Sequence, residues 1–252
     1  DLVRSRGLGD VYKRQVIAQV ECAKNVLLQQ RTEPQGLVKI SCPLLMMRFQ
    51  IRELINHFLK AYPKVEIELE LTSRRVDVLY DDIDIAIRTN FEMTEDSSLI
   101  VRDVIKTTHC LVAAPEVLQG KLIENYQQLT DFPCIGLGNQ KQDYVWVLRH
   151  HENNRHVDIR FNPRMRCNDL AGVYYAACDG LGIADLPYLT VEEDIKQGKL
   201  IHILPEWESN EGMVQLVYAS RKGQRLVVEK LIETLVGGMR SLGNMKKGYR
   251  LI

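Results

Sequence analysis

Hydroxyl-bearing side chains, a thiol and one arginine stand where three predicted strands end. In chain order they are Ser41, Cys42, Thr72, Ser73 and Arg88. Hydroxyl groups and free backbone N–H groups at the starts of helices bind anions, and a guanidinium adds a bidentate positive charge. These residue types predict a site for a small anion. Ordinary helix caps and a surface arginine are the simpler alternative for the same residues.

The elements that would position these groups are three strands and two helices. The strands are predicted over residues 37–42, 65–71 and 83–88, and the helices over 51–61 and 73–80. The first helix has one apolar stripe, and the proline at position 63 would end it. The order strand–helix–strand–helix–strand predicts a parallel sheet with right-handed crossovers. Ligands bind beyond the carboxyl ends of such strands, so the candidate residues would meet at one edge.

Residues 166–187 supply a second set of candidate groups. Asn168 and Asp169 are good N-caps for a helix that would end at Gly180, and the start of that helix would direct free N–H groups outward. Simple capping would account for the same residues. A buried strand is predicted over 181–184. Gly136, in a short glycine-rich strand end without the GxGxxG spacing of nucleotide sites, completes the set of candidate ligand contacts.

The remaining chain alternates apolar and polar stretches. Polar residues 89–98 and 139–156 indicate surface loops, although three histidines in the second stretch make a metal site conceivable without a recognisable ligand pattern. Further strands are predicted near Trp146 and over 99–105, 109–114, 157–161, 200–204 and 213–219, and helices over 188–197 and 226–239. Near 106–108 the chain would cross into a second lobe, and near 205–207 it would return.

Composition limits the classes of function. The 252 residues hold equal numbers of acidic and basic side chains, which leaves no electrostatic footprint for nucleic acid. The six cysteines have no metal-like spacing, and no cofactor motif is present. We interpret most of them as reduced, buried thiols, with Cys42 and Cys167 less certain because both lie near the predicted site. Without a secretory signal or a run of membrane-spanning length, the sequence predicts a cytoplasmic protein with no membrane partner.

Several ordered segments carry a family resemblance. They read GLVKISCP, HFLKAYPKVEIELELTSRRVDVLYDDIDIAIR, SSLIVRDV, HCLVAAPEVL, CNDLAGVYYAACDGLGIADLP and GKLIHILPEW. Together they resemble the effector-binding domain of LysR-type transcriptional regulators over residues 16–239. The resemblance implies an α/β fold of the type 2 periplasmic-binding-protein class, with two Rossmann-like lobes, mixed and mainly parallel sheets, and two crossover segments. It also implies a small-molecule effector, expected to be anionic, between the lobes.

The resemblance also implies a division of the chain. Residues 1–15 look like a non-native or disordered lead, and 16–33, with apolar residues at alternating steps of four and three, resemble part of the linker helix that pairs two subunits. Lobe I is expected over 37–106 plus 208–240 and lobe II over 107–207. A homodimer or homotetramer is expected. The family's winged helix-turn-helix is not among these residues, so we expect DNA binding only through that missing N-terminal domain.

Two other classes of function compete with a sensing domain. A solute-binding protein of a transporter has the same architecture, but it predicts an export signal and usually no dimerising helix. An enzyme would need a nucleophile with its base, or paired carboxylates in a cleft, and the sequence shows no such motif. We therefore expect no enzymatic activity.

Overall fold

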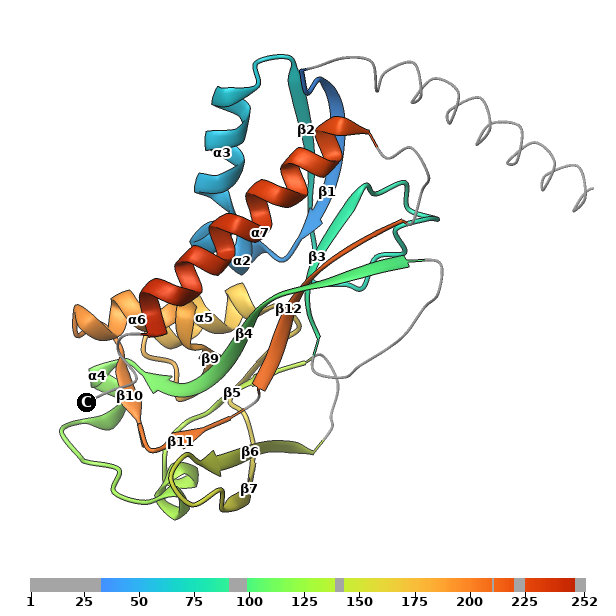
Figure 1. Ribbon diagram of the computed structural model, residues 1–252. Coiled ribbons are helices and arrows are strands. Elements are labelled where there is room, and N and C mark those ends of the chain that lie inside the picture. Colours follow the sequence, from blue (N-terminus) through green and yellow to red (C-terminus); the bar gives the residue numbers. More distant parts are fainter. Residues whose placement is uncertain (1–32, 91–98, 139–142, 210, 220–224, 248–252) are drawn as a thin grey trace, which may run out of the picture.

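The computed structural model describes residues 33–90, 99–138, 143–209, 211–219 and 225–247 (Figure 1). The predicted lead over 1–15 lies outside these residues. So do nearly all of the predicted linker helix over 16–33 and most of the predicted loop over 89–98.

The described chain contains both strands and helices, with three runs of consecutive strands: β2 to β4, β5 to β8 and β10 to β12. The strands are β1 (Gly36–Cys42), β2 (Val65–Leu71), β3 (Ile85–Asn90), β4 (Leu99–Ala113), β5 (Ile135–Leu137), β6 (Tyr144–His150), β7 (His156–Phe161), β8 (Met165–Cys167), β9 (Ala184–Pro187), β10 (Ile201–Ile203), β11 (Trp207–Glu208) and β12 (Glu211–Ala219). The helices are α2 (Leu44–Met46), the π-helical η1 (Met47–Ile51), α3 (Arg52–Ala61), α4 (Pro115–Leu118), the 3-10 helix η2 (Tyr126–Asp131), α5 (Leu170–Cys178), α6 (Tyr188–Lys196) and α7 (Leu226–Lys247). The predicted α/β class is confirmed.

A mixed sheet in the order β2-β1-β3-β12-β4-β10, with β9 also paired to β4, runs through the molecule. Strand β1 is parallel to β2 and β3, as the alternation of strands and helices predicts, whereas β12 is antiparallel to β3 and β4. Smaller sheets are formed by β11-β6-β7 and β5-β8. Among the described strands antiparallel pairs outnumber parallel ones, so the expectation of mainly parallel sheets is wrong. Part of the excess of antiparallel pairs comes from β9, which runs back along β4, and from the β6–β7 hairpin.

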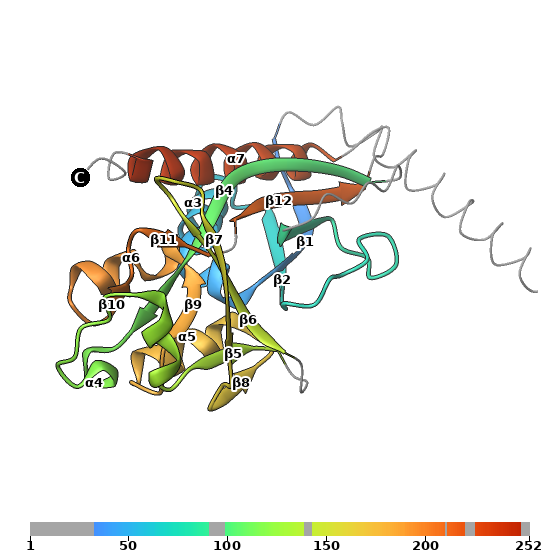
Figure 2. The same ribbon diagram turned by 90° about the horizontal axis from the view of Figure 1, so that it is seen from below.

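Strand β4 connects two hydrophobic cores. Its residues 99–108 pair with β12, and its residues 109–113 pair with β9 and β10. In Figure 2, β4 extends from beside α7 to the elements around β9 and β10. The first core contains β1, β3, β12, α3 and α7, and the second contains the far half of β4 with β9, α5 and α6.

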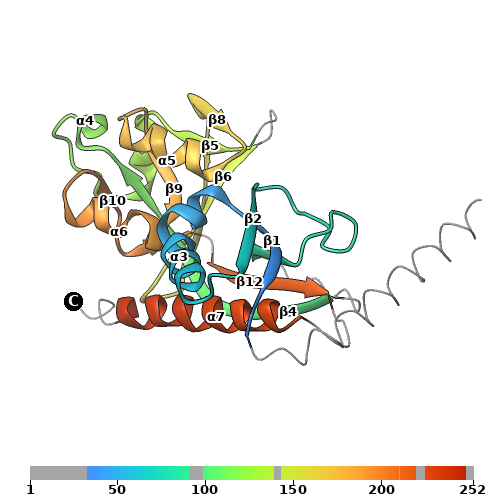
Figure 3. The same ribbon diagram turned by 90° about the horizontal axis from the view of Figure 1, so that it is seen from above.

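Helix α3 buries the predicted apolar stripe against the sheet. Ile51, Ile55 and Phe58 are almost completely buried, and the helix ends at Ala61 ahead of the Tyr62-Pro63 step. Helix α7 packs beside α3, as Figure 3 shows, and its apolar face completes the same core. Both helices therefore lie on one face of the β1–β3 part of the sheet, and the cavity described below is lined in part by β1 and β3.

The structure corrects one predicted helix and one predicted loop. Residues 73–80 form turns instead of a helix, because the Asp77 carboxylate accepts hydrogen bonds from the backbone N–H groups of Leu79 and Tyr80. Such local side-chain bonds compete with helical ones. The stretch 139–156 is not all loop: from position 144 it forms β6 of a hairpin, and alternate burial of Tyr144, Trp146 and Leu148 gives that strand its inner face.

The strand expected over 181–184 is also displaced. It begins at Ala184 and continues to Pro187, because β9 pairs with residues 109–112 of β4 in that register. Pro187 is thus part of the strand and immediately precedes α6.

Phe58→Ala should lower the free energy of unfolding by about 3–5 kcal/mol, because it leaves a cavity in the first core. Phe58 is 1% exposed, whereas Tyr80 is 79% exposed and is the matched aromatic control. Tyr80→Ala should change the stability by less than about 0.5 kcal/mol. Urea unfolding followed by circular dichroism measures both. Equal losses in the two variants would contradict the packing described for α3.

Candidate functional site

A cavity of about 540 Å³ lies between the β1–β3 part of the sheet and the elements around β9, α5 and β6. Polar groups in its wall come from both sides and are Ser41, Gln50, Thr72, Ser73, Arg74, Arg75, Arg88, Thr89, Thr107, His109, Asp143, Asn168, Asp185 and Thr190. Apolar and aromatic side chains make up the rest of the wall. A cavity in which polar groups converge among apolar and aromatic side chains is the usual form of a small-molecule site.

Five of the eight sequence-predicted residues line this cavity. They are Ser41, Thr72, Ser73, Arg88 and Asn168. The backbone N–H of Thr72 donates to the carbonyl oxygen of Cys42 at 3.0 Å, which joins the ends of the parallel strands β1 and β2. The parallel register therefore brings these residues together, as expected. Arg88 lies two residues before the end of β3 rather than at its end.

The other three predicted residues do not line the cavity. Cys42 is fully buried in the first core, and its thiol donates to the carbonyl oxygen of Pro43. Gly136 lies against Tyr144, so that a Cβ built there would be 2.6 Å from the Tyr144 ring. Asp169 caps α5 through a 2.8 Å bond from the Ala171 N–H.

Arg88 carries a positive charge that the described residues leave uncompensated. Its Nε is buried and has no hydrogen-bond partner within the described residues. Burial and the nearby charge of Arg75 both lower the pKa of Arg88. An arginine keeps its charge even so, because its ordinary pKa lies above the physiological range by several units. A negatively charged ligand would offset both the cost of burying this charge and the repulsion from Arg75.

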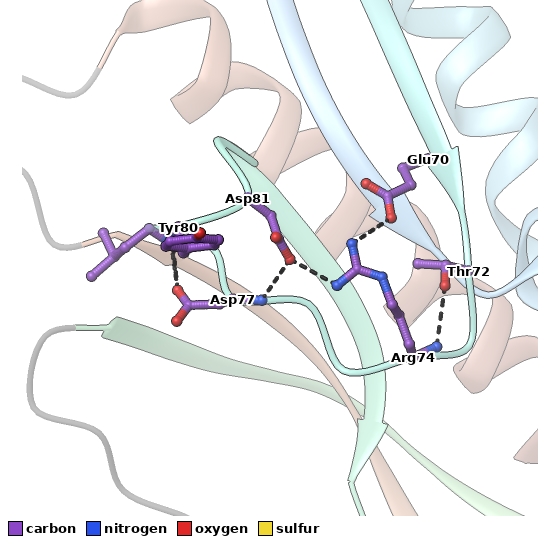
Figure 4. A network of polar contacts seen from close by, with 7 residues as sticks. Glu70, Thr72, Arg74, Asp77, Tyr80 and Asp81 are labelled. Carbon is purple, nitrogen blue, oxygen red and sulfur yellow. Dashed lines mark hydrogen bonds and ion pairs between the residues drawn. The ribbon is translucent and has the colours of Figure 1, made fainter.

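Arg74, which lines the same wall, is compensated. Its guanidinium contacts Glu70 at 2.9 Å and Asp81 at 2.8 Å, and its backbone N–H donates to Thr72 Oγ1 (Figure 4). The Asp81 carboxylate also accepts from the backbone N–H of Asp77, so the network holds the loop between β2 and β3 in place. Its hydrogen bond to Arg74 is the main reason that the pKa of Asp81 is lowered.

A cluster of polar side chains lies where β4 stops pairing with β12 and begins to pair with β9. His109 Nδ1 lies 3.6 Å from Asp185 Oδ1, and the Ser209 hydroxyl donates to the same oxygen. Thr107 and Thr190, both almost completely buried, line the cavity as well. None of these five residues was predicted from the sequence as a site residue, because they come together only through the pairing of β4 with β9. Polar residues inside otherwise apolar strands were the available signal.

Aromatic residues of the β6–β7 hairpin complete the wall. Trp146 and Phe161 stack with ring centroids 4.0 Å apart, and Tyr144 also contacts Phe161. All three line the cavity. They were missed as site residues because Tyr144 lies in a stretch interpreted as loop, and because the strands predicted near Trp146 and over 157–161 were not expected to reach the site.

Polar contacts join the β1–β3 side to α5. The Ser73 hydroxyl donates to the Asp169 carboxylate, and the Arg48 guanidinium donates to the Tyr175 hydroxyl. The Arg48 guanidinium also lies 5.2 Å from the centre of the Tyr175 ring, within the range of a cation–π contact. The two sides of the cavity are thus linked by side chains as well as by β4.

Some other kinds of chemistry find little support in the described part of the chain. No group of three or more His, Cys, Asp or Glu side chains there is placed to hold a metal ion. Cys42, Cys110, Cys134, Cys167 and Cys178 are free thiols. Within the same residues, no helix has the length and apolar character that a membrane crossing requires.

Comparison with known proteins gives one consistent family. The family model of the LysR substrate binding domain matches residues 31–240. The HTH-type transcriptional regulator PtxR of Pseudomonas aeruginosa is 26% identical over 81% of this chain and 64% of its own length. The probable HTH-type transcriptional regulator LtrA of Klebsiella pneumoniae is 30% identical over 81% of this chain and 68% of its own length. The chain thus spans about two thirds of these relatives.

Solved structures agree with this match. The regulatory domain of AphB from Vibrio vulnificus superposes with a TM-score of 0.66 at 26% identity, covering 81% of this chain and 98% of that domain. The predicted fold type, that of LysR regulatory domains, is therefore confirmed.

Gly136→Ala should lower the free energy of unfolding by about 1–3 kcal/mol, because the new methyl group would overlap the Tyr144 ring. The matched control is Gly237→Ala in α7, where a Cβ meets nothing within 4 Å. That variant should be neutral or more stable by up to about 1 kcal/mol, because alanine favours helix. Thermal unfolding measures both. A Gly136→Ala variant as stable as the wild type would show that the Tyr144 ring can move away from position 136 at little cost.

Cys42 and Cys134 should resist alkylation in the native protein at mildly alkaline pH. Burial raises the pKa of each thiol to about 12, so both remain protonated and unreactive. The partly exposed Cys167 should be modified faster. Peptide-resolved mass spectrometry after iodoacetamide treatment measures the rates, with the unfolded protein as reference. Rapid labelling of Cys42 would mean that the first core opens readily.

Proposed function

This chain belongs to the family of LysR substrate-binding domains, and we propose that its cavity binds a small anionic metabolite and so alters the conformation of a LysR-type transcriptional regulator. The observation that carries the anionic part of this proposal is Arg88. Its guanidinium is partly buried, its Nε has no partner within the described residues, and Arg75 repels it. A carboxylate or similar anion would provide the missing charge.

Hydroxyl and amide groups around Arg88 support the same ligand chemistry. Ser41 and Thr72 lie at the ends of β1 and β2, and Asn168 lies just before α5 on the other side of the cavity. Each can donate a hydrogen bond to an anionic oxygen. Such bonds to a charged acceptor contribute roughly 1.5–3 kcal/mol each. The site would therefore hold its ligand by contacts from both sides.

Contacts from both sides are what a change of conformation requires. We propose that the chain forms two lobes, 37–106 with 208–240 and 107–207, which move about the crossings at β4 and before β12. A ligand shifts such an equilibrium only if it binds one arrangement better than the other. An anion bound by Arg88 on one side and Asn168 on the other would favour the arrangement in which they are close.

The comparisons separate this proposal from its alternatives. The relatives are transcriptional regulators and the similar structure is a regulatory domain, so the chain is identified as a regulatory domain and not as an enzyme. They also favour a regulator over a solute-binding protein of a transporter. We propose that the regulator works in the cytoplasm as a homodimer or homotetramer and contacts DNA through a separate domain.

Arg88→Gln should weaken binding of carboxylates at least tenfold, because truncating one partner of a buried charged pair costs roughly 2–5 kcal/mol. A thermal-shift screen of small carboxylates on the wild-type protein first selects ligands, since a ligand of the native state raises the melting temperature. The same ligands are then measured with Arg88→Gln and Arg88→Lys. The lysine variant should bind with intermediate affinity, because it keeps the charge and loses the bidentate geometry.

The matched control is Arg160→Gln, which removes one positive charge from the exposed face of β7 outside the cavity. It should bind as the wild type does. Without ligand, Arg88→Gln should be at least as stable as the wild type, since it removes an uncompensated charge. An Arg88→Gln variant that keeps the full ligand-induced shift would refute the role proposed for Arg88.

A further inference from the structure

We infer that the ligand of this cavity is a carboxylic acid that carries a hydrogen-bond donor, a hydroxyl or an ammonium group, at its other end, and that Asp185 accepts this donor. The inference rests on the proposed function, because it takes Arg88 as the partner of the carboxylate. It adds the chemical class of the second ligand group and the residue that selects it.

Charge is distributed unequally over the two sides of the cavity. Arg88, whose charge the described residues leave uncompensated, lines the β1–β3 side, where Arg74 is compensated by Glu70 and Asp81. Two acidic residues line the cavity among the described residues. Asp185 lies on the side formed by β4, β9 and α6, and Asp143 lies in an exposed position before β6. A cavity with a cationic side and an anionic side favours a ligand whose own groups are opposite in character.

The Asp185 carboxylate is held in a fixed place. It lies on β9, its side chain is 15% exposed, and it accepts the Ser209 hydroxyl on one oxygen, with His109 Nδ1 at 3.6 Å from that oxygen. An ionised carboxylate can accept about four hydrogen bonds. A ligand donor can therefore share Asp185 with these neighbours, and because little of this side chain is exposed, the bond depends strongly on the chemistry of the ligand.

The surroundings of Asp185 strengthen this selection. Thr107 and Thr190 line the same region and are 4% and 3% exposed, so a ligand group that enters it leaves water and must find partners there. A hydroxyl or ammonium group can donate to Asp185. A second carboxylate would instead meet the Asp185 charge in a region of low solvent access, which is unfavourable. The cavity should therefore discriminate against dicarboxylates.

The test compares ligands that differ only at one end. The probes are three matched sets: γ-aminobutyrate, γ-hydroxybutyrate and succinate; δ-aminovalerate, δ-hydroxyvalerate and glutarate; ε-aminocaproate, ε-hydroxycaproate and adipate. Affinities are measured by calorimetry or by thermal shift. In at least one set, a donor-bearing acid should bind the wild-type protein about tenfold or more tightly than its dicarboxylate, and the comparison of the amino with the hydroxy acid identifies the donor.

Variants assign the effect to a residue. Asp185→Asn should reduce the preference for the donor-bearing acid to about one or reverse it. Asp158→Asn, which removes an acid from the exposed face of β7 outside the cavity, should leave the preference unchanged. If Asp185→Asn does not fold, the ranking of the nine probes on the wild-type protein still decides. The inference is overturned if no donor-bearing acid binds better than its matched dicarboxylate, or if Asp185→Asn keeps the full preference.

This failure can be told apart from failure of the proposed function. A dicarboxylate that binds tightly and loses its affinity in Arg88→Gln would support the anion site and overturn only the role of Asp185. Binding of the carboxylates without any dependence on Arg88 would overturn the proposed function as well.

Discussion

One continuous strand, β4, contributes side chains to the first and the second hydrophobic core described above. Strand β4 pairs with β12 up to Thr108 and with β9 and β10 from His109 onwards, so the same strand is hydrogen-bonded into both parts. Thr107 and His109, on either side of this change, both line the cavity. Because a strand presents every second side chain to the same face, these two residues point the same way. The wall of the cavity and the connection between the cores are therefore built from the same residues.

The electrostatics of the cavity depend on which arginine has a partner. Arg74 lies in the loop after β2, and the carboxylates of Glu70 in β2 and of Asp81 in the loop are close in sequence and can reach it. Arg88 lies inside β3, where its strand neighbours are fixed by pairing with β12, and the described residues bring no carboxylate to it. The cost of leaving such a charge uncompensated lowers the stability of the free domain. An anion bound there as proposed would recover that cost, and the interaction would then be selective for charged ligands.

Periodicity in the sequence predicted most elements and part of the site. The helical stripe ending with Phe58 and the alternation over 65–71 were sufficient for α3 and β2, and hydroxyl groups at strand ends located one wall of the cavity. Ser41 and Cys42 show the limit of this reasoning. Adjacent strand residues face opposite sides, so only one of the two could reach the cavity, and the pattern did not tell which. The wall around Asp185 could not be predicted from local patterns, because it depends on the long-range pairing of β4 with β9.

Hydrogen bonds that already join the two sides of the cavity influence how the conformation can respond to a ligand. The Ser73 hydroxyl, which lines the cavity, donates to Asp169, and Arg48 donates to Tyr175. A carboxylate that took the Ser73 hydroxyl would release Asp169 to its remaining role as the cap of α5, where it accepts from Ala171. It would exchange one bond between the sides for another that passes through the ligand. The response of the domain therefore depends on the difference between these two bonds, and not on the affinity of the ligand alone.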